Sequence, residues 1–447
     1  MALQIVQEEF TRFFRTIIPE PQNREPLTFA HLPYFAVGYI PFFCLAYLAR
    51  RPNTHTLRLL LLPIVVLSNL TIAFRYYWTI PSLNVYNWGQ CLFAEVTVGK
   101  ALEYALHREG MLKVGEVQPG KRKESIHTNG NGVANGKTNG VANGHSHPKH
   151  ATSSSATPTS WLPRWFVEPV ELMLTLRGLQ FKFGQGMHIP KPTRPLERGP
   201  FLQATFRSFI KNFLLLDLLE SVIKLFPGVG DVSGGTMFYS NLSPIQRYAV
   251  STIIHMLTGS ALLAGFGMVY DLITFIAVGV LHDTPTSWPP VTDHPWSSES
   301  MHECWSKRWH QLLRQTFIVF GGYPGHWLAG KYGAVLGTFI ASGLYHELAI
   351  YGMGKGFSIH PPLFFSMQAG ILVLERLWRV VTGRRVGGWY GRMWVYFVMF
   401  VLSQPMVDSW HRRGLGGGMI IPVWVSPSKY LLPPLVKFFT SLLLTQK

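Results

Sequence analysis

Charged residues are scarce in this chain, and cysteines are scarcer still. Only 14% of its 447 residues are Asp, Glu, Lys or Arg, against about 25% in a typical soluble domain. The three cysteines, Cys44, Cys91 and Cys304, lie far apart in the sequence. A scattered, odd set of this kind provides neither a disulfide framework nor the spacing of a metal site. The low share of charged residues argues against a soluble protein. The apolar residues argue against it too, because they come in long blocks rather than in amphipathic periods.

Acidic residues are the scarcer of the two charged classes. The chain has 23 Asp and Glu against 40 Lys and Arg, which gives a formal net charge of +17. Such an excess can indicate nucleic-acid binding, but here the basic residues fall mainly in loops beside apolar stretches. That distribution is typical of the cytosolic loops of membrane proteins. A basic cytosolic face would also attract an anionic substrate, and we expect no nucleic-acid partner.

Apolar and aromatic residues are what the chain has in abundance, at 47% hydrophobic and 14% aromatic. A bilayer core requires about 20 apolar residues per helix. We therefore predict an all-α, polytopic integral membrane protein with roughly eight to ten transmembrane helices or half-spans. The block 248–281 is too long for one straight crossing, so it forms either one tilted helix or two short ones. The predicted spans are 27–49, 59–74, 88–106, 209–226, 248–281, 317–328, 332–351, 363–381, 394–407 and 419–444.

A polar segment divides the chain into two membrane regions. Residues 1–106 hold the first helices, after a short N-terminal stretch that we expect to be an amphipathic interfacial helix rather than a secretory signal. Residues 107–160 form a cytosolic linker, and 129–160, in which "NGVANG" occurs twice, cannot bury enough apolar surface to fold and should be disordered. Residues 161–447 form the larger membrane domain.

The basic loops predict the orientation in the membrane. Lys and Arg gather at 50–58, in the linker, at 302–314 and at 376–392, which we assign to the cytosol, whereas 227–244 has neither and is assigned to the lumen. Asn241 begins a possible glycosylation sequon there. An endoplasmic reticulum location fits this arrangement.

His346 is the first candidate for chemistry. It follows thirteen uncharged residues, 333–345, inside a predicted span, and ionisable groups in such positions are functional candidates. Ser342 shares its helical face and Glu347 follows it directly. Histidine suits general-base catalysis, although from this helix alone a packing role is an equal alternative. His255, in another span, has no basic or aromatic cluster beside it, which favours packing there.

The segment "ECWSKRWHQLLR" (303–314) is basic and aromatic between apolar stretches. Arg and Lys bind phosphates, and Trp offers a stacking surface and an N–H donor. A cytosolic loop with interfacial tryptophans is the usual explanation of such a segment. His346 lies only 36 residues beyond His310, and this pairing favours a substrate site.

Five segments together resemble the wax synthase-like branch of the membrane-bound O-acyltransferases. "SMHECWSKRWHQLLR" (300–314) resembles its signature, with Cys304 where an aromatic residue is usual. The other four occur in the same order as in the family: "RGLQF" (177–181), "SWPPV" (287–291), "SGLYHE" (342–347) and "FFSMQAGILVLE" (364–375). The resemblance covers residues 163–447.

This resemblance implies a membrane-bound acyltransferase that moves an acyl group from acyl-CoA to a hydroxyl. His346 would be the catalytic base, and His310 would orient the thioester or stabilise the oxyanion. Fungal members that acetylate terpenoids and meroterpenoids suggest acetyl-CoA as co-substrate and a hydrophobic alcohol from the bilayer as acceptor, with no metal and no further cofactor. The residues expected to bind substrate or CoA are Trp305, Lys307, Arg308, Trp309, Gln311, Arg314, Ser342, Glu347, Gln368 and Glu375.

Other classes fit the sequence less well. A prenyltransferase requires two Asp-rich motifs to hold Mg²⁺, whereas Asp271, Asp283 and Asp293 are isolated. A transporter predicts repeated halves, which are absent from this unevenly divided sequence. Synthesis of long-chain wax or sterol esters stays open as an alternative activity, and a multi-pass transporter or scaffold without chemistry as an alternative of another class.

Overall fold

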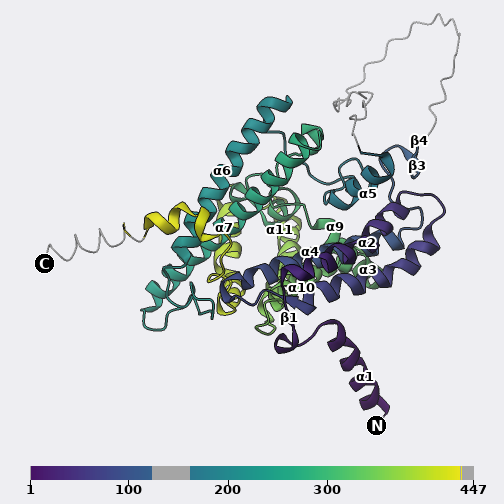
Figure 1. Ribbon diagram of the computed structural model, residues 1–447. Coiled ribbons are helices and arrows are strands. Elements are labelled where there is room, and N and C mark those ends of the chain that lie inside the picture. Colours follow the sequence, from purple (N-terminus) through teal and green to yellow (C-terminus); the bar gives the residue numbers. More distant parts are fainter. Residues whose placement is uncertain (1, 123–161, 433, 435–447) are drawn as a thin grey trace, which may run out of the picture.

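The computed structural model describes residues 2–122, 162–432 and 434, and nearly all of its regular structure is helical (Figure 1). This confirms the predicted all-α, polytopic fold. The helices before the linker are α1 (Ala2–Ile17), α2 (Leu32–Ala49), α3 (His55–Arg75) and α4 (Asn84–Leu106). Those after it are α5 (Arg164–Leu174), α6 (Arg198–Ile223), α7 (Pro244–Gly279), α8 (Met301–Glu303), α9 (Arg314–Phe317), α10 (Tyr323–Tyr351), α11 (His360–Thr382), α12 (Gly388–Phe397) and α13 (Gln404–Arg412).

Four helical segments of the described residues are long and apolar enough to cross a membrane. They are Phe29–Ala49, His55–Arg75, Pro244–Gly279 and Arg314–Tyr351. Many of their Leu, Ile and Val side chains are exposed, which suits contact with lipid. The chain is therefore an integral membrane protein. The block expected to be one tilted helix or two short ones is a single helix, α7, of 36 residues.

The predicted span 419–444 begins too early, since its described residues are α-helical only from 427. Residues 419–426 are not α-helical and contain a short 3-10 turn at Val423–Val425. The physical reason is that the backbone amides of Ile420 and Ile421 donate to the carboxylate of Glu220, at 3.1 and 2.9 Å. The segment is thereby held against α6, and residues 435–447 lie outside the described residues.

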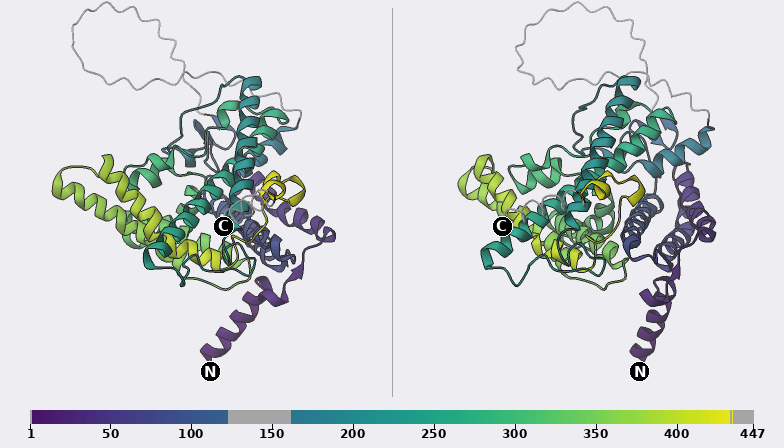
Figure 2. Two further views of the ribbon diagram at one scale, coloured as in Figure 1. Left: turned by 90° about the vertical axis from the view of Figure 1, so that its left-hand side faces the viewer. Right: turned by 60° about the vertical axis from the view of Figure 1, so that its left-hand side comes forward.

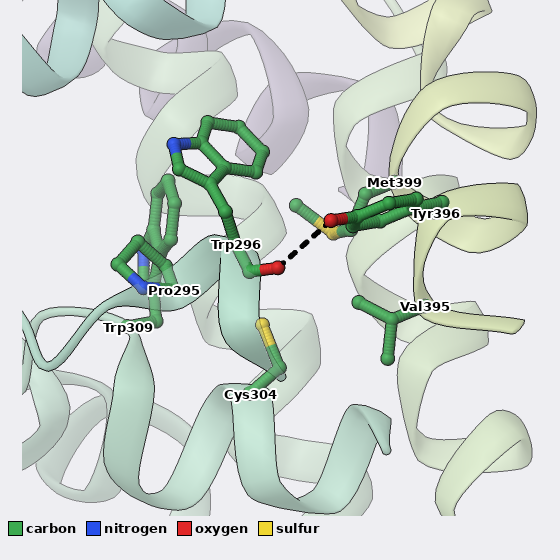
Figure 3. Close-up of a pocket in the computed structure, with 7 residues that line it drawn as sticks. All are labelled: Pro295, Trp296, Cys304, Trp309, Val395, Tyr396 and Met399. Carbon is green, nitrogen blue, oxygen red and sulfur yellow. Dashed lines mark hydrogen bonds between the residues drawn. The ribbon is translucent and has the colours of Figure 1, made fainter. Parts of the chain in front are cut away.

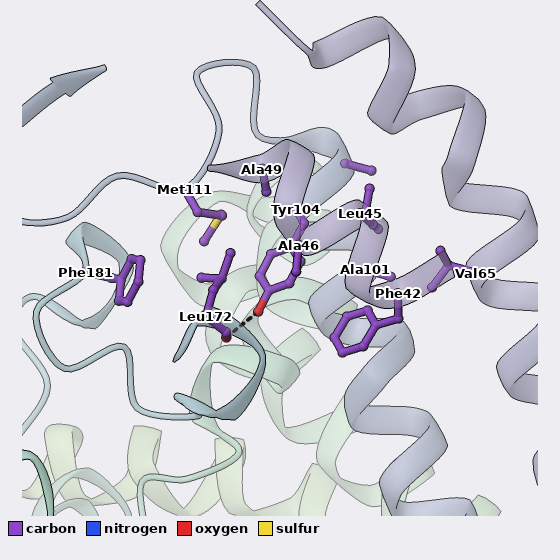
Figure 4. Packing of buried hydrophobic residues seen from close by; sticks show 11 residues of the cluster. Phe42, Leu45, Ala46, Ala49, Val65, Ala101, Tyr104, Met111, Leu172 and Phe181 are labelled. Atoms are coloured by element: carbon purple, nitrogen blue, oxygen red, sulfur yellow. Dashed lines mark hydrogen bonds between the residues drawn. The ribbon is translucent and has the colours of Figure 1, made fainter. Parts of the chain in front are cut away.

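The first helices pack around a core that also includes residues beyond position 106. Phe42 of α2 and Tyr104 of α4 stack in this core, together with Met111, Leu172 and Phe181 (Figure 4). The Tyr104 hydroxyl donates to the Leu172 carbonyl at 2.7 Å.

Residues 107–122, which we predicted as part of the cytosolic linker, are therefore part of the packed structure. They carry the strand pair β3 (Glu116–Gln118) and β4 (Lys121–Arg122). Glu116 accepts two hydrogen bonds from the Arg50 guanidinium, at 2.7 and 2.8 Å. A second pair, β1 (Glu25–Pro26) and β2 (Tyr76–Tyr77), joins the chain before α2 to the end of α3. The repeats at 129–160 lie outside the described residues.

Residues 314–351 form a tight helical hairpin. The helical backbone breaks at Ala329 and Gly330, and Gly330 has a φ of 58°, a conformation that glycine adopts without strain. On either side the two arms meet through glycines, since a Cβ on Gly321 would lie 1.9 Å from the Gly337 carbonyl oxygen. This packing brings the start of α9 near the end of α10, and thus the basic segment near His346. Beyond it, α11 and α12 form a second hairpin that projects from the body (Figure 2, yellow-green).

Candidate functional site

His346 lies near the end of α10 with one ring nitrogen already bonded. Its Nδ1 is 2.7 Å from the carbonyl oxygen of Ser342, one turn earlier in the same helix. A carbonyl can only accept, so Nδ1 carries the proton of the neutral ring and Nε2 carries the lone pair. The Ser342 contribution is therefore its backbone carbonyl, which fixes the tautomer that a general base requires.

Aromatic rings enclose the His346 imidazole. Phe365 of α11 stacks on it with 4.5 Å between centroids, and Trp410 of α13 lies nearly parallel, at 12° and 6.5 Å. Phe317 and Tyr345 lie at its edges, at 6.2 and 5.6 Å. The enclosure keeps the ring orientation fixed, while the side chain retains some exposed surface.

The segment 300–314 enters the site along α11. Glu375 of α11 accepts hydrogen bonds from the backbone amides of Met301 and His302, at 2.7 and 3.0 Å. The Ser300 hydroxyl accepts from the Glu303 amide at 3.0 Å and caps the same turn. Glu375 is therefore a support for the start of the segment.

One π-helical turn, Cys304–Arg308, then carries Trp305 toward His346. The Trp305 indole donates to the side-chain oxygen of Gln368 at 3.1 Å. Its ring contacts Phe365, the same ring that stacks on His346. Gln368 is fully buried, so it orients Trp305 rather than presenting an open surface.

His310 follows at the turn after the π-helix. Its ring lies 5.5 Å from Trp309 and 5.2 Å from Phe266 of α7. Burial, with a smaller effect of nearby His346, lowers the pKa of His310 to about 3, so the ring is neutral at physiological pH. Its buried Nδ1 has no hydrogen-bond partner among the described residues. Gln311 braces this turn by donating to the carbonyls of Trp305 and Trp309, at 2.9 and 3.0 Å.

The three basic residues of the segment differ in their freedom. Arg308 donates to Glu303 at 2.9 Å and to the Asp293 carbonyl at 3.3 Å. Lys307 and Arg314 are exposed. The structure thus leaves Lys307 and Arg314 as the cations available to an anionic ligand and gives Arg308 a role in holding the loop.

A small hollow lies beside Trp309 (Figure 3). Pro295, Trp296, Cys304, Trp309, Val395, Tyr396 and Met399 line it, and the Tyr396 hydroxyl donates to the Trp296 carbonyl at 2.9 Å. Cys304, where an aromatic residue is usual in the pattern that this segment resembles, is one of the buried lining residues.

Glu347 does not face the same space as His346. Its carboxylate accepts from the Arg413 guanidinium at 2.5 and 2.8 Å and from the Ser358 amide at 2.7 Å, and the residue is fully buried. No polar surface of Glu347 is left for a substrate, so the binding role expected from the sequence has no support in this geometry. Arg413 lies three residues after Trp410, and Glu347 directly follows His346. The ion pair of Glu347 and Arg413 therefore fixes the helix that carries Trp410 relative to the helix that carries His346.

Sequence reasoning missed Phe317, Phe365, Trp410 and Arg413. The stretch "DSWHRRG" (408–414) is basic and aromatic like 303–314, and that likeness was the available signal for Trp410 and Arg413. Arg177 has a supporting role, since it donates to the carbonyls of Pro289 and Pro290 at 2.8 and 2.7 Å and holds the loop before the segment. His255 belongs to α7, and its ring lies against Phe400 and 3.4 Å from the Ser403 hydroxyl, an arrangement that suits packing.

A family match coincides with this site. The sequence model of the membrane bound O-acyl transferase family matches residues 288–367. These residues include the segment 300–314, His310, His346 and Phe365. The chain resembles the membrane-bound O-acyltransferases. No solved structure matches the chain.

Curated relatives come from fungi. The acetyltransferase aurG of Calcarisporium arbuscula is 26% identical over 261 residues, which cover 54% of this chain and 59% of that protein. The acetyltransferase atnC of an Arthrinium species is 25% identical over 303 residues, or 61% of this chain and 68% of that protein. The O-mevalon transferase yanI of Aspergillus niger is 25% identical over 231 residues, covering 46% and 50%. The match thus spans only 59% of the length of the first of these relatives.

Proposed function

We propose that this protein is a membrane-bound O-acyltransferase that moves an acetyl group from acetyl-CoA to a hydroxyl of a hydrophobic, terpenoid-type metabolite. The observation that carries the proposal is the His346 imidazole, whose Nδ1 proton is bonded to Ser342 and whose Nε2 is left as the base. The family match over the same residues and the names of the fungal relatives support acyl transfer, and acetyl in particular.

In this mechanism the acceptor hydroxyl meets His346 Nε2. The nitrogen takes the hydroxyl proton as the oxygen attacks the thioester carbon. The carbonyl oxygen becomes an oxyanion, and a neutral His310 with a protonated nitrogen toward it would stabilise that charge. The C–S bond then breaks, the ester leaves, and the CoA thiolate takes the proton from His346. Lys307 and Arg314 would bind the phosphates of CoA.

The side of the membrane is part of the proposal. We propose that the segment 300–314 and the CoA site lie on the cytosolic side of the endoplasmic reticulum, with 227–244 in the lumen, and the distribution of Lys and Arg among the loops supports this orientation. Acceptor alcohols would enter from the bilayer. Long-chain wax or sterol ester synthesis would use the same base with a different donor.

The test uses microsomes that contain the protein, His346→Ala or His310→Ala. Acyl-CoAs from acetyl to palmitoyl are offered with terpenoid and fatty alcohols, and ester products are detected by mass. We expect acetyl esters from the wild type and a loss of about 10²–10⁴ in rate for His346→Ala, the usual contribution of a general base. Turnover of His346→Ala within a few-fold of the wild type would exclude the mechanism. A palmitoyl ester that depends on His346 would keep the mechanism and change the donor.

A further inference from the structure

The hairpin of α11 and α12 ends in a tip with an unusual combination of side chains. Between Glu375 and Asp408 the sequence has five arginines and no acidic residue. Arg379, Arg384 and Arg385 are exposed. Among the described residues, the ion pair in this region belongs to Arg392, which meets Glu299 at 3.2 Å.

Large apolar side chains surround these arginines and are also uncovered. Val380 and Val381 are 74% and 75% exposed, and Trp389 and Tyr390 are 67% and 87% exposed. Exposed apolar area of this size costs free energy in water, at about 25 cal/mol per Å². The hairpin projects from the body (Figure 2), so the rest of the described chain does not cover it.

The backbone holds the tip in a defined shape. Gly383 has a φ of 69° and ends α11, and the Arg384 amide donates to the Thr382 hydroxyl at 3.2 Å. On the other side of the turn, the Gly388 amide donates to Glu299 at 2.9 Å. The tip is therefore a formed surface next to the start of the segment 300–314.

We propose that this tip, residues 377–390, binds the headgroups of anionic phospholipids. Trp and Tyr favour the boundary between acyl chains and headgroups, and arginines that flank them pair with phosphate. A soluble nucleotide would neutralise the arginines but leave Val380, Val381 and Trp389 in water. A bilayer surface covers both kinds of side chain at once, which favours lipid over CoA as the occupant.

The test measures lipid binding by the full chain in neutral detergent, with fluorescent phosphatidylserine or phosphatidylcholine as probe. The variant Arg384→Gln/Arg385→Gln should bind phosphatidylserine at least about tenfold more weakly, since each arginine near an anionic surface contributes about 1 kcal/mol. Phosphatidylcholine binding should stay the same. The matched control is Arg207→Gln/Lys211→Gln, which removes two exposed charges from α6 and should leave both probes unaffected.

Three results would overturn the proposal. An equal loss of phosphatidylserine affinity in the α6 control would show that the binding depends on net charge alone and not on the tip. Unchanged phosphatidylserine binding in Arg384→Gln/Arg385→Gln would show that the lipid binds at another part of the protein. Displacement of the lipid probe by adenosine 3′,5′-bisphosphate would assign the tip to CoA. Because the assay requires no turnover, its outcome is independent of the acyltransferase proposal.

Discussion

At the scale of single residues, the site depends on side chains that act through their neighbours. His346 owes its free Nε2 to a backbone carbonyl, and its ring plane to Phe365 and Trp410. Trp410 in turn is joined to the base by the pair of Glu347 and Arg413. Groups that touch no substrate can therefore affect the rate.

Breaking the buried pair is expected to be costly. Glu347→Gln leaves the Arg413 charge buried without its partner, which typically costs about 3–5 kcal/mol. We expect a lower melting temperature in detergent and a lower kcat with little change in KM for acetyl-CoA. The double variant Glu347→Gln/Arg413→Met should recover stability, because replacing both charges removes the unpaired one. A single variant as stable as the wild type would contradict this reading.

The Arg50 and Glu116 pair gives a pH dependence of stability. Burial alone would raise the pKa of Glu116, but the bonds from Arg50 and from the Lys113 and Gly120 amides lower it overall. A lowered folded-state pKa stabilises the fold at pH above the ordinary value of 4.5, and this stabilisation is lost as the pH falls through the folded value.

Thermal unfolding of Glu116→Gln checks this dependence. The variant should melt several degrees lower at neutral pH and lose less stability than the wild type on acidification. Identical curves for the two proteins would indicate that the pair of Arg50 and Glu116 contributes nothing to stability.

At the scale of elements, the hairpin 314–351 positions the site through backbone contact. Gly321→Ala and Gly337→Ala would each place a methyl about 2 Å from a carbonyl oxygen across the hairpin, at 1.9 and 2.1 Å. Overpacking of this kind costs about 1–3 kcal/mol, so we expect lower melting temperatures and reduced activity. Gly370→Ala is the matched control, because its Cβ would meet nothing within 4 Å and alanine favours the helix.

The sequence was sufficient for some elements and not for others. Apolar blocks predicted α2, α3 and α7, because lipid-facing helices are apolar all round. The prediction of a helix was wrong at 419–426, where the Glu220 carboxylate accepts hydrogen bonds from two backbone amides. Composition cannot report such a long-range bond. His346 could be found from its apolar helix, and the basic stretch 408–414 pointed to Arg413. The bond between Arg413 and Glu347 could not be found, since it joins residues 66 positions apart.

At the scale of the whole molecule, the orientation in the membrane can be tested with one sequon. Asn241 is exposed in the loop between α6 and α7. If that loop is lumenal, the protein should lose mass on endoglycosidase treatment, and Asn241→Gln should abolish the shift. Asn69 is the control, because it is fully buried and its amide donates to the Val65 carbonyl at 2.8 Å. An Asn241 that stays unmodified while the enzyme is active would count against the assigned sides.

The bond between His346 Nδ1 and Ser342 also bears on the order of events in catalysis. With Nδ1 held by its own helix, the ring cannot pass a proton from one face to the other. In the proposed mechanism the same Nε2 would accept the proton from the alcohol and return it to the sulfur. That mechanism therefore requires alcohol and thioester on one side of the imidazole together, and it predicts a ternary complex in which CoA departs only after the acceptor has arrived.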